Sequence, residues 1–131
     1  FLEVPINLAM ADWPHRRSLV LGALLSGAGF GGLAVAAAPW AVVATVVAWT
    51  LGEMVLFPGM AAYVADIAPP ERRGVYMGLY TFMWSVAFAV GPWLGTIALD
   101  RAGATALWTG CIVCGAHSAG IFALTGGQRD G

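Results

Sequence analysis

A short charged segment with two adjacent prolines, residues 66–74, separates two long apolar stretches of this chain. The sequence has six basic and seven acidic residues, and four of them lie in this segment: Asp66, Glu71, Arg72 and Arg73. The 26 residues at 74–99 carry no formal charge. A soluble domain scatters charge over its whole surface. Charge that is confined to turns between apolar stretches of membrane-spanning length therefore predicts a chain that crosses a bilayer several times.

The composition supports a membrane protein. Hydrophobic residues make up 60% of the chain and charged residues 10%, whereas about a quarter is typical of soluble domains. Mean hydropathy is +0.79, and the net charge of -1 argues against a nucleic-acid partner. Cys111 and Cys114 lie inside an apolar stretch, where small packing residues are expected rather than metal ligands. No cofactor is predicted.

The apolar stretches predict an all-α, polytopic bundle of transmembrane helices. A hydrocarbon core of roughly 30 Å needs about 20 mostly apolar residues per helix. Four stretches meet that length, and the first residues read as the end of a fifth helix. We expect a single transmembrane domain over residues 1–131, with a partial span at about 1–11 and full spans at about 18–37, 41–65, 74–99 and 104–125.

Arginine placement predicts the orientation. Arg16 and Arg17 follow the first span, Arg72 and Arg73 lie in the charged hinge, and Arg129 is near the end. These three sites fall on one membrane side if every span crosses. Because cytoplasmic loops are enriched in basic residues, this side is expected to be cytoplasmic.

Small residues recur four apart in three places. The pairs are Gly27 and Gly31, Gly74 and Gly78, and Gly91 and Gly95. Close backbone approach at such residues promotes helix association in lipid, so all three pairs predict tightly packed helix crossings.

The hinge and the helix after it resemble the major facilitator superfamily of secondary transporters. Residues 58–74 (PGMAAYVADIAPPERRG) and 73–78 (RGVYMG) are similar to a helix junction of that family. Residues 90–95 (VGPWLG) are similar to its antiporter motif, in which Gly91, Pro92 and Gly95 mark a kinked helix. Residues 12–17 (DWPHRR) resemble a degenerate form of the acidic-and-basic turn after the second or eighth helix.

This resemblance implies a fragment of a twelve-helix transporter built from two six-helix halves. The five helices correspond to eight to twelve or to two to six, and the end of the sequence after the last span favours eight to twelve. The implied function is proton-coupled efflux of a small apolar or amphipathic molecule by alternating access, in the bacterial inner membrane. The implied partners are that substrate, the proton, the lipid bilayer and the missing N-terminal half.

Three residues are candidates for proton coupling. Glu53 lies near the middle of its span, where a carboxyl group is costly unless it faces other helices or water. Glu3 stands beside Pro5 and either lines the same cavity or satisfies backbone groups freed by the proline. His117 lies among small residues of the last span, where packing is the alternative to a relay role.

Two charged turns form a candidate cytoplasmic gate. Its residues are Asp12, Arg16, Arg17, Asp66, Arg72 and Arg73. They either fix topology as solvated charges or form interhelix ion pairs that stabilise one transport state.

Two other functional classes remain open from the sequence. The first is a membrane scaffold or sensor with a transporter-like fold, because fold alone does not fix function. The second, a polytopic membrane enzyme, is disfavoured, because His15, the one interfacial histidine, has no convincing nucleophile beside it. We therefore expect a transporter and no enzymatic activity.

Overall fold

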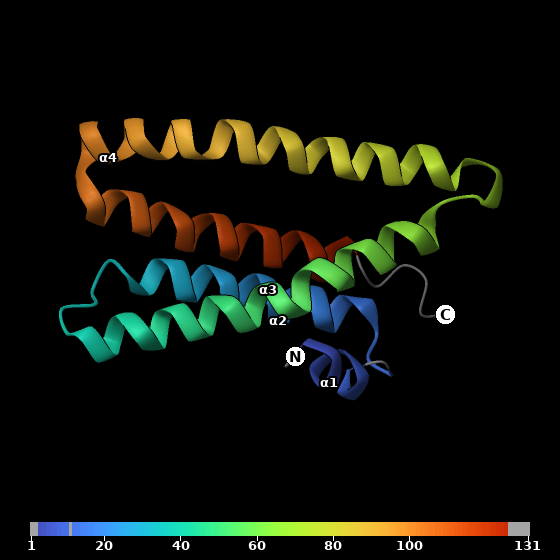
Figure 1. The fold of residues 1–131 in the computed structure, drawn as a ribbon, viewed down its shortest axis with the longest axis horizontal. Helices are drawn as coiled ribbons and strands as arrows, with labels where there is room; N and C mark the ends of the chain where they lie inside the picture. The colour runs from blue at the N-terminus through green and yellow to red at the C-terminus, as the bar shows by residue number, and fades with distance from the viewer. Residues whose placement is uncertain (1–2, 11, 126–131) are drawn as a thin grey trace.

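The computed structural model describes residues 3–10 and 12–125, and it confirms the all-α fold. The elements are α1 (Glu3–Ala9), α2 (His15–Gly32), α3 (Pro39–Ile67), the 3-10 turn η1 (Pro70–Arg72) and α4 (Arg73–Thr125). Figure 1 shows the long helices running side by side along one axis, with α1 as a short piece near the start of α2. The described residues contain no strand.

A tight backbone turn ends α2, and Ala38 and Pro39 mark the start of α3. After Gly32 the chain makes three backbone hydrogen bonds of the i to i+3 type, which tighten the end of α2 into a turn. Ala38 is extended and Pro39 occupies the first helical position, where its missing N–H costs nothing. The expected spans at 18–37 and 41–65 are therefore helices, but α2 begins three residues earlier and ends five residues earlier than predicted.

Glycines bring α2 and α3 into close contact. A Cβ built on Gly22 would lie 2.9 Å from the Cβ of Leu56, and one built on Gly52 would lie 2.5 Å from the Oγ of Ser26. Gly29 packs directly against the backbone of Trp49, whose ring stacks on Phe30 with centroids 4.4 Å apart. The two helices thus form an antiparallel pair with almost no side chain between their backbones.

The helix α4 consists of two runs, because the chain reverses at Gly103. Gly103 has φ 82° and ψ 171°, a combination that is nearly restricted to glycine. Figure 1 shows the chain turning back there, so that residues 73–102 (the first run) and 104–125 (the second run) lie roughly antiparallel. The reversal lies between the expected spans at 74–99 and 104–125.

The apolar helices are long enough for a membrane. The two helical stretches that meet the length and hydropathy requirements are Pro39–Ile67 and Pro70–Thr125. A straight helix of the second length would measure about 84 Å, far more than a bilayer core of roughly 30 Å. The reversal at Gly103 gives each run about the length of one crossing. The total of five spans stays a prediction.

The second run of α4 packs on α2 through glycines. A Cβ on Gly115 would lie 2.6 Å from the Cα of Gly27, and Gly31 packs against the side chain of Ile112. The predicted close packing at Gly27 and Gly31 is therefore present, and it joins α2 to α4.

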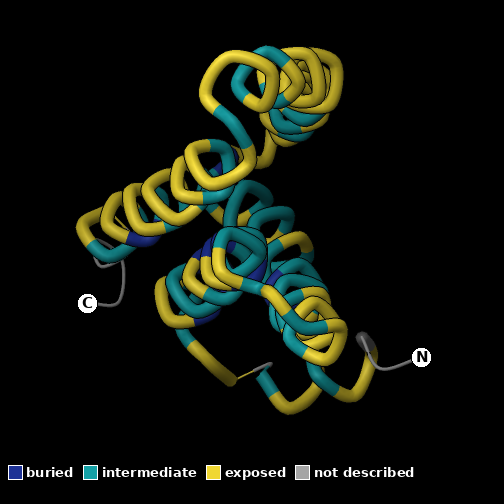
Figure 2. The backbone as a smooth tube through the Cα atoms, turned by 90° about the vertical axis from the view of Figure 1, so that its left-hand side faces the viewer, coloured by how far each residue is buried: buried dark blue, intermediate teal, exposed yellow. Residues whose placement is uncertain are grey.

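The other two glycine pairs do not form packed crossings among the described residues. A Cβ on any of Gly74, Gly78, Gly91 or Gly95 would meet nothing within 4 Å, so close packing at these two pairs stays a prediction. The reason is the placement of the first run, which is exposed over most of its length and stands away from α2 (Figure 2).

Candidate functional site

A direct contact joins the start of α2 to the end of α3. The Nε2 atom of His15 lies 2.7 Å from the Oδ2 atom of Asp66, across 51 positions of sequence. A carboxylate only accepts hydrogen bonds, so Nε2 of His15 carries the proton and donates it. We call this contact the His15–Asp66 link.

Tyr63 adds a second contact from the same face of α3. Its ring lies edge-on to the imidazole of His15, with centroids 6.2 Å apart and planes at 68°. Tyr63 and Asp66 are three residues apart on one helix, a spacing that puts both side chains on one face. The end of α3 therefore contacts the imidazole of His15 twice, through the ring of Tyr63 and through the carboxylate of Asp66.

The helix dipoles favour this arrangement. An acidic group near the C-terminus of its own helix is unfavourable, as is a histidinium at an N-terminus. In the link each side chain reaches the opposite helix, so Asp66 lies near the positive end of α2 and His15 near the negative end of α3. Because α2 has no side-chain N-cap, the carboxylate of Asp66 supplies negative charge that the start of this helix otherwise lacks.

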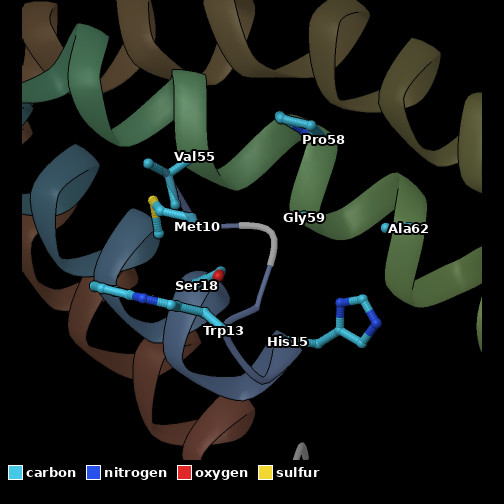
Figure 3. Close-up of a pocket in the computed structure, with 8 residues that line it drawn as sticks. All are labelled: Met10, Trp13, His15, Ser18, Val55, Pro58, Gly59 and Ala62. Carbon is cyan, nitrogen blue, oxygen red and sulfur yellow. The ribbon is translucent and has the colours of Figure 1, made fainter. Parts of the chain in front are cut away.

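A cavity of about 200 Å³ lies beside the link. It is bounded by the turn between α1 and α2, the first residues of α2 and the second half of α3 (Figure 3). Three of its lining residues, Trp13, His15 and Ser18, have side chains with a polar group. The lining residues are Met10, Trp13, His15, Ser18, Val55, Pro58, Gly59 and Ala62.

The six residues of the predicted cytoplasmic gate all lie at this end of the molecule, but they do not form the expected pairs. Asp66 contacts His15, and this is the one contact at salt-bridge distance that the structure gives among residues 3–10 and 12–125. The other five side chains, which are exposed, are Asp12, Arg16, Arg17, Arg72 and Arg73.

The end of α4 also reaches this side. A cavity of about 400 Å³ is lined by Arg16, Arg17 and Val20 of α2 and by Ala123 of α4, with Pro14 completing it. The start of α2 and the end of the second run therefore lie at the same end of the molecule, as the arginine pattern predicts. Arg129 lies outside the described residues.

Glu53 is half-buried on α3, away from the link. Thirteen residues separate it from Asp66, which is about 20 Å along a helix. It shares a helix face with Phe57 and Met60, four and seven residues later. Phe57 meets Trp84 of α4 edge-to-face, with centroids 4.8 Å apart, so this face of α3 is directed toward the first run. The described residues provide no hydrogen bond or ion pair to the Glu53 carboxylate.

The remaining candidates lie apart from one another. Glu3 begins α1, but its side chain is outside the described part of the structure. His117 is exposed on the second run of α4. The helix continues through Gly91, Pro92 and Gly95, and Gly103 is its one residue with non-helical backbone angles. A kink at the glycine-proline motif stays a prediction.

His15 is the residue of this candidate site that was not predicted as part of the gate. Its role depends on Asp66, and nothing local in the sequence joins two positions so far apart. One signal was available. The arginine pattern predicts that both turns lie on the same membrane side, which makes any titratable residue in one turn a possible partner for the other.

The fold is that of an integral membrane protein. Long apolar helices expose large hydrophobic side chains, such as Trp40 (75%) and Phe88 (69%), that water disfavours and lipid or further helices accept. Within this class the sequence identifies the family. Residues 1–126 match the Major Facilitator Superfamily, and the chain belongs to it.

Curated relatives have transporter names. The chain is 34% identical over 87 residues to the uncharacterized MFS-type transporter YqjV of Bacillus subtilis (strain 168), a match that covers 66% of this chain and 21% of the relative. It is 28% identical over 117 residues to the multidrug resistance protein MdtH of Photorhabdus laumondii, covering 88% of this chain and 27% of the relative. It is also 30% identical to MdtH of Klebsiella pneumoniae, covering 70% and 23%.

These matches support the predicted class of protein, and each covers only part of the relative. Membership in a transporter family confirms the expectation that the chain is not from an enzyme. The chain spans between 21% and 27% of the length of these curated relatives. No solved structure matches it significantly.

Proposed function

We propose that this chain is part of one half of a proton-coupled exporter, which moves a small apolar or amphipathic molecule outward across a bacterial inner membrane. The observation that carries this proposal is the His15–Asp66 link. It joins two polar turns that the positive-inside rule assigns to the cytoplasm. Two curated relatives bear the name multidrug resistance protein, which supports efflux as the direction of transport.

In this proposal the link biases alternating access. It is a single exposed contact at the ends of two helices, so small movements of those ends break it. Exposed pairs are worth about 1 kcal/mol or less, which is enough to change the ratio of two conformations up to about fivefold. The link therefore favours whichever state keeps the ends of α2 and α3 together.

Glu53 is the proposed carrier of the coupling proton. An ionised carboxylate in the middle of a span is costly, and the described residues offer it no cationic partner. Protonation removes that cost. A carboxyl group that is neutral in one state and ionised in the other links proton movement to the change of conformation. Glu3 and His117 remain secondary candidates for this role.

The open face of the first run is the proposed contact with the rest of the transporter. Gly74, Gly78, Gly91 and Gly95 leave its surface flat, and nothing among the described residues covers it. Flat glycine surfaces are where membrane helices approach closely. We assign this face to helices of the remaining sequence.

Flux in vesicles that contain the full-length protein tests the proposal. Inverted vesicles energised by an imposed proton gradient should accumulate ethidium, an aromatic amphipathic probe, and collapse of the gradient should stop accumulation. A membrane scaffold or sensor would give no flux above that of protein-free vesicles, and this result would refute the transporter proposal.

A further inference from the structure

The cavity of about 400 Å³ between the start of α2 and the end of the second run has the features of a binding site. Its volume is within the range of sites that take small molecules. It is separate from the cavity beside the His15–Asp66 link, because the two share no lining residue. The lining residues are Pro14, Arg16, Arg17, Val20 and Ala123.

Two adjacent positive charges stand at this cavity. Arg16 and Arg17 are exposed, and none of the described residues around the cavity is acidic. The described side chains give neither guanidinium group an acidic partner at salt-bridge distance. Guanidinium groups without a counter-charge attract phosphate, whose oxygens match the planar fork of N–H donors.

The cavity becomes apolar one helical turn beyond the arginines. Val20 follows Arg16 by four positions and Arg17 by three, spacings that place the three side chains on one side of α2. Val20 and Ala123 are half-buried, and the small side chain of Ala123 leaves space on the side of the second run. A molecule in this cavity therefore meets positive charge at one end and apolar side chains at the other.

The cavity also lies where the charged ends of the helices give way to apolar sequence. Residues 18–32 of α2 and 104–125 of the second run contain no Asp, Glu, Lys or Arg. In a membrane protein this transition lies at the level of the lipid headgroups. The arginine pattern predicts the cytoplasmic side for this end, and the cytoplasmic leaflet carries a negative surface potential.

We propose that this cavity binds the headgroup of an anionic phospholipid. The phosphate lies between Arg16 and Arg17, and the acyl chains run past Val20 and Ala123 into the bilayer. A zwitterionic phospholipid binds less well, because its ammonium group meets the same two positive charges. The site does not depend on which molecule the protein transports, so its test is separate from the flux experiment.

Native mass spectrometry of the purified full-length protein in neutral detergent tests the site by counting bound lipids. The probes are dioleoyl phosphatidylglycerol, which is anionic, and dioleoyl phosphatidylcholine, which is zwitterionic. The native protein should bind the first at least about tenfold more tightly, because two arginines near a membrane surface each contribute about fivefold to the binding of an anionic lipid. The double variant Arg16→Gln/Arg17→Gln should weaken phosphatidylglycerol binding at least about tenfold for the same reason.

The double variant Arg72→Gln/Arg73→Gln is the matched control for charge. It also removes two adjacent, exposed arginines at this end of the molecule, but neither of them lines the cavity. This variant should bind phosphatidylglycerol like the native protein. Equal losses in the two double variants would mean that the lipid responds only to the net charge of this end, and would overturn the site.

Ala123→Phe tests the space in the cavity, because it fills that space and leaves both arginines in place. It should weaken phosphatidylglycerol binding several-fold, whereas Leu124→Phe, at an exposed neighbour that does not line the cavity, should not. Equal binding by these two variants would overturn the site. The arginine variants change exposed side chains only, so they decide the question even if Ala123→Phe fails to fold.

Inorganic phosphate distinguishes a lipid from a soluble anion as the occupant. Phosphate alone offers the same charge to the arginines but has no acyl chain to lie along the apolar side chains. It should therefore not displace phosphatidylglycerol from the native protein. If phosphate and phosphatidylglycerol bind equally tightly, the cavity is a site for soluble anions and the lipid proposal is wrong.

Discussion

His15 Nε2 and Asp66 Oδ2 lie 2.7 Å apart and tie the first turn of α2 to the last turn of α3. Each group compensates the unfavourable end of the other's helix, and the edge of Tyr63 limits the movement of the imidazole. The contact places two distant polar turns at one end of the molecule. Its partners are exposed to 41% and 66%, so it is a contact that can open.

Breaking the link should shift the conformational population. In a full-length background with Cys111→Ala and Cys114→Ala, we place a reporter thiol at Ala62, which lines the cavity beside the link. Asp66→Asn or His15→Ala should change the rate of Ala62→Cys modification from the cytoplasmic side by up to about fivefold. Asp100→Asn, at the opposite end, should leave it unchanged. Equal rates of modification in all variants would mean that the charged turns only set the orientation of the chain in the membrane.

The contact between Gly27 and Gly115 should tolerate no side chain. Gly115→Ala would put a Cβ 2.6 Å from the Cα of Gly27, and the second run must then move away from α2. We expect a loss of about 1–3 kcal/mol in the free energy of unfolding, the usual cost of overpacking. Gly110→Ala lies in the same run with open space around it, and should cost nothing. Unfolding in detergent, followed by circular dichroism, compares the two variants.

The reversal at Gly103 should require glycine. An alanine at φ 82° and ψ 171° is strained by about 1–3 kcal/mol, even though there is space for its Cβ. Gly103→Ala should therefore lower the thermal midpoint, whereas Gly120→Ala, also with open space around it, should not. Equal midpoints for the two variants would mean that the chain turns without a left-handed residue at this position.

Much of the fold follows from local signals in the sequence. Pro39 begins α3, the pair Pro69 and Pro70 ends it, and Gly103 divides α4, and each of these residues acts on its own backbone. The C-terminal end of α2 differs from the prediction because residues 33–35 are apolar but tighten into a turn. Apolarity measures suitability for lipid, and helix formation needs caps and hydrogen bonds as well.

The contacts between helices were harder to predict. Gly27 and Gly31 have the same spacing as Gly91 and Gly95, yet one pair packs on α4 and the other is open. Spacing marks a surface that permits close approach, and the arrangement of the helices decides whether a partner is present. The His15–Asp66 link was missed for the same reason.

One comparison in proteoliposomes shows whether Glu53 carries the coupling proton. Full-length Glu53→Gln is compared with Glu71→Gln, which changes an exposed glutamate of the hinge. Each is measured for ethidium exchange at equal pH and for accumulation driven by a proton gradient. We predict that Glu53→Gln retains exchange but loses gradient-driven accumulation, and that Glu71→Gln retains both. Full gradient-driven accumulation by Glu53→Gln would show that Glu53 does not carry the coupling proton.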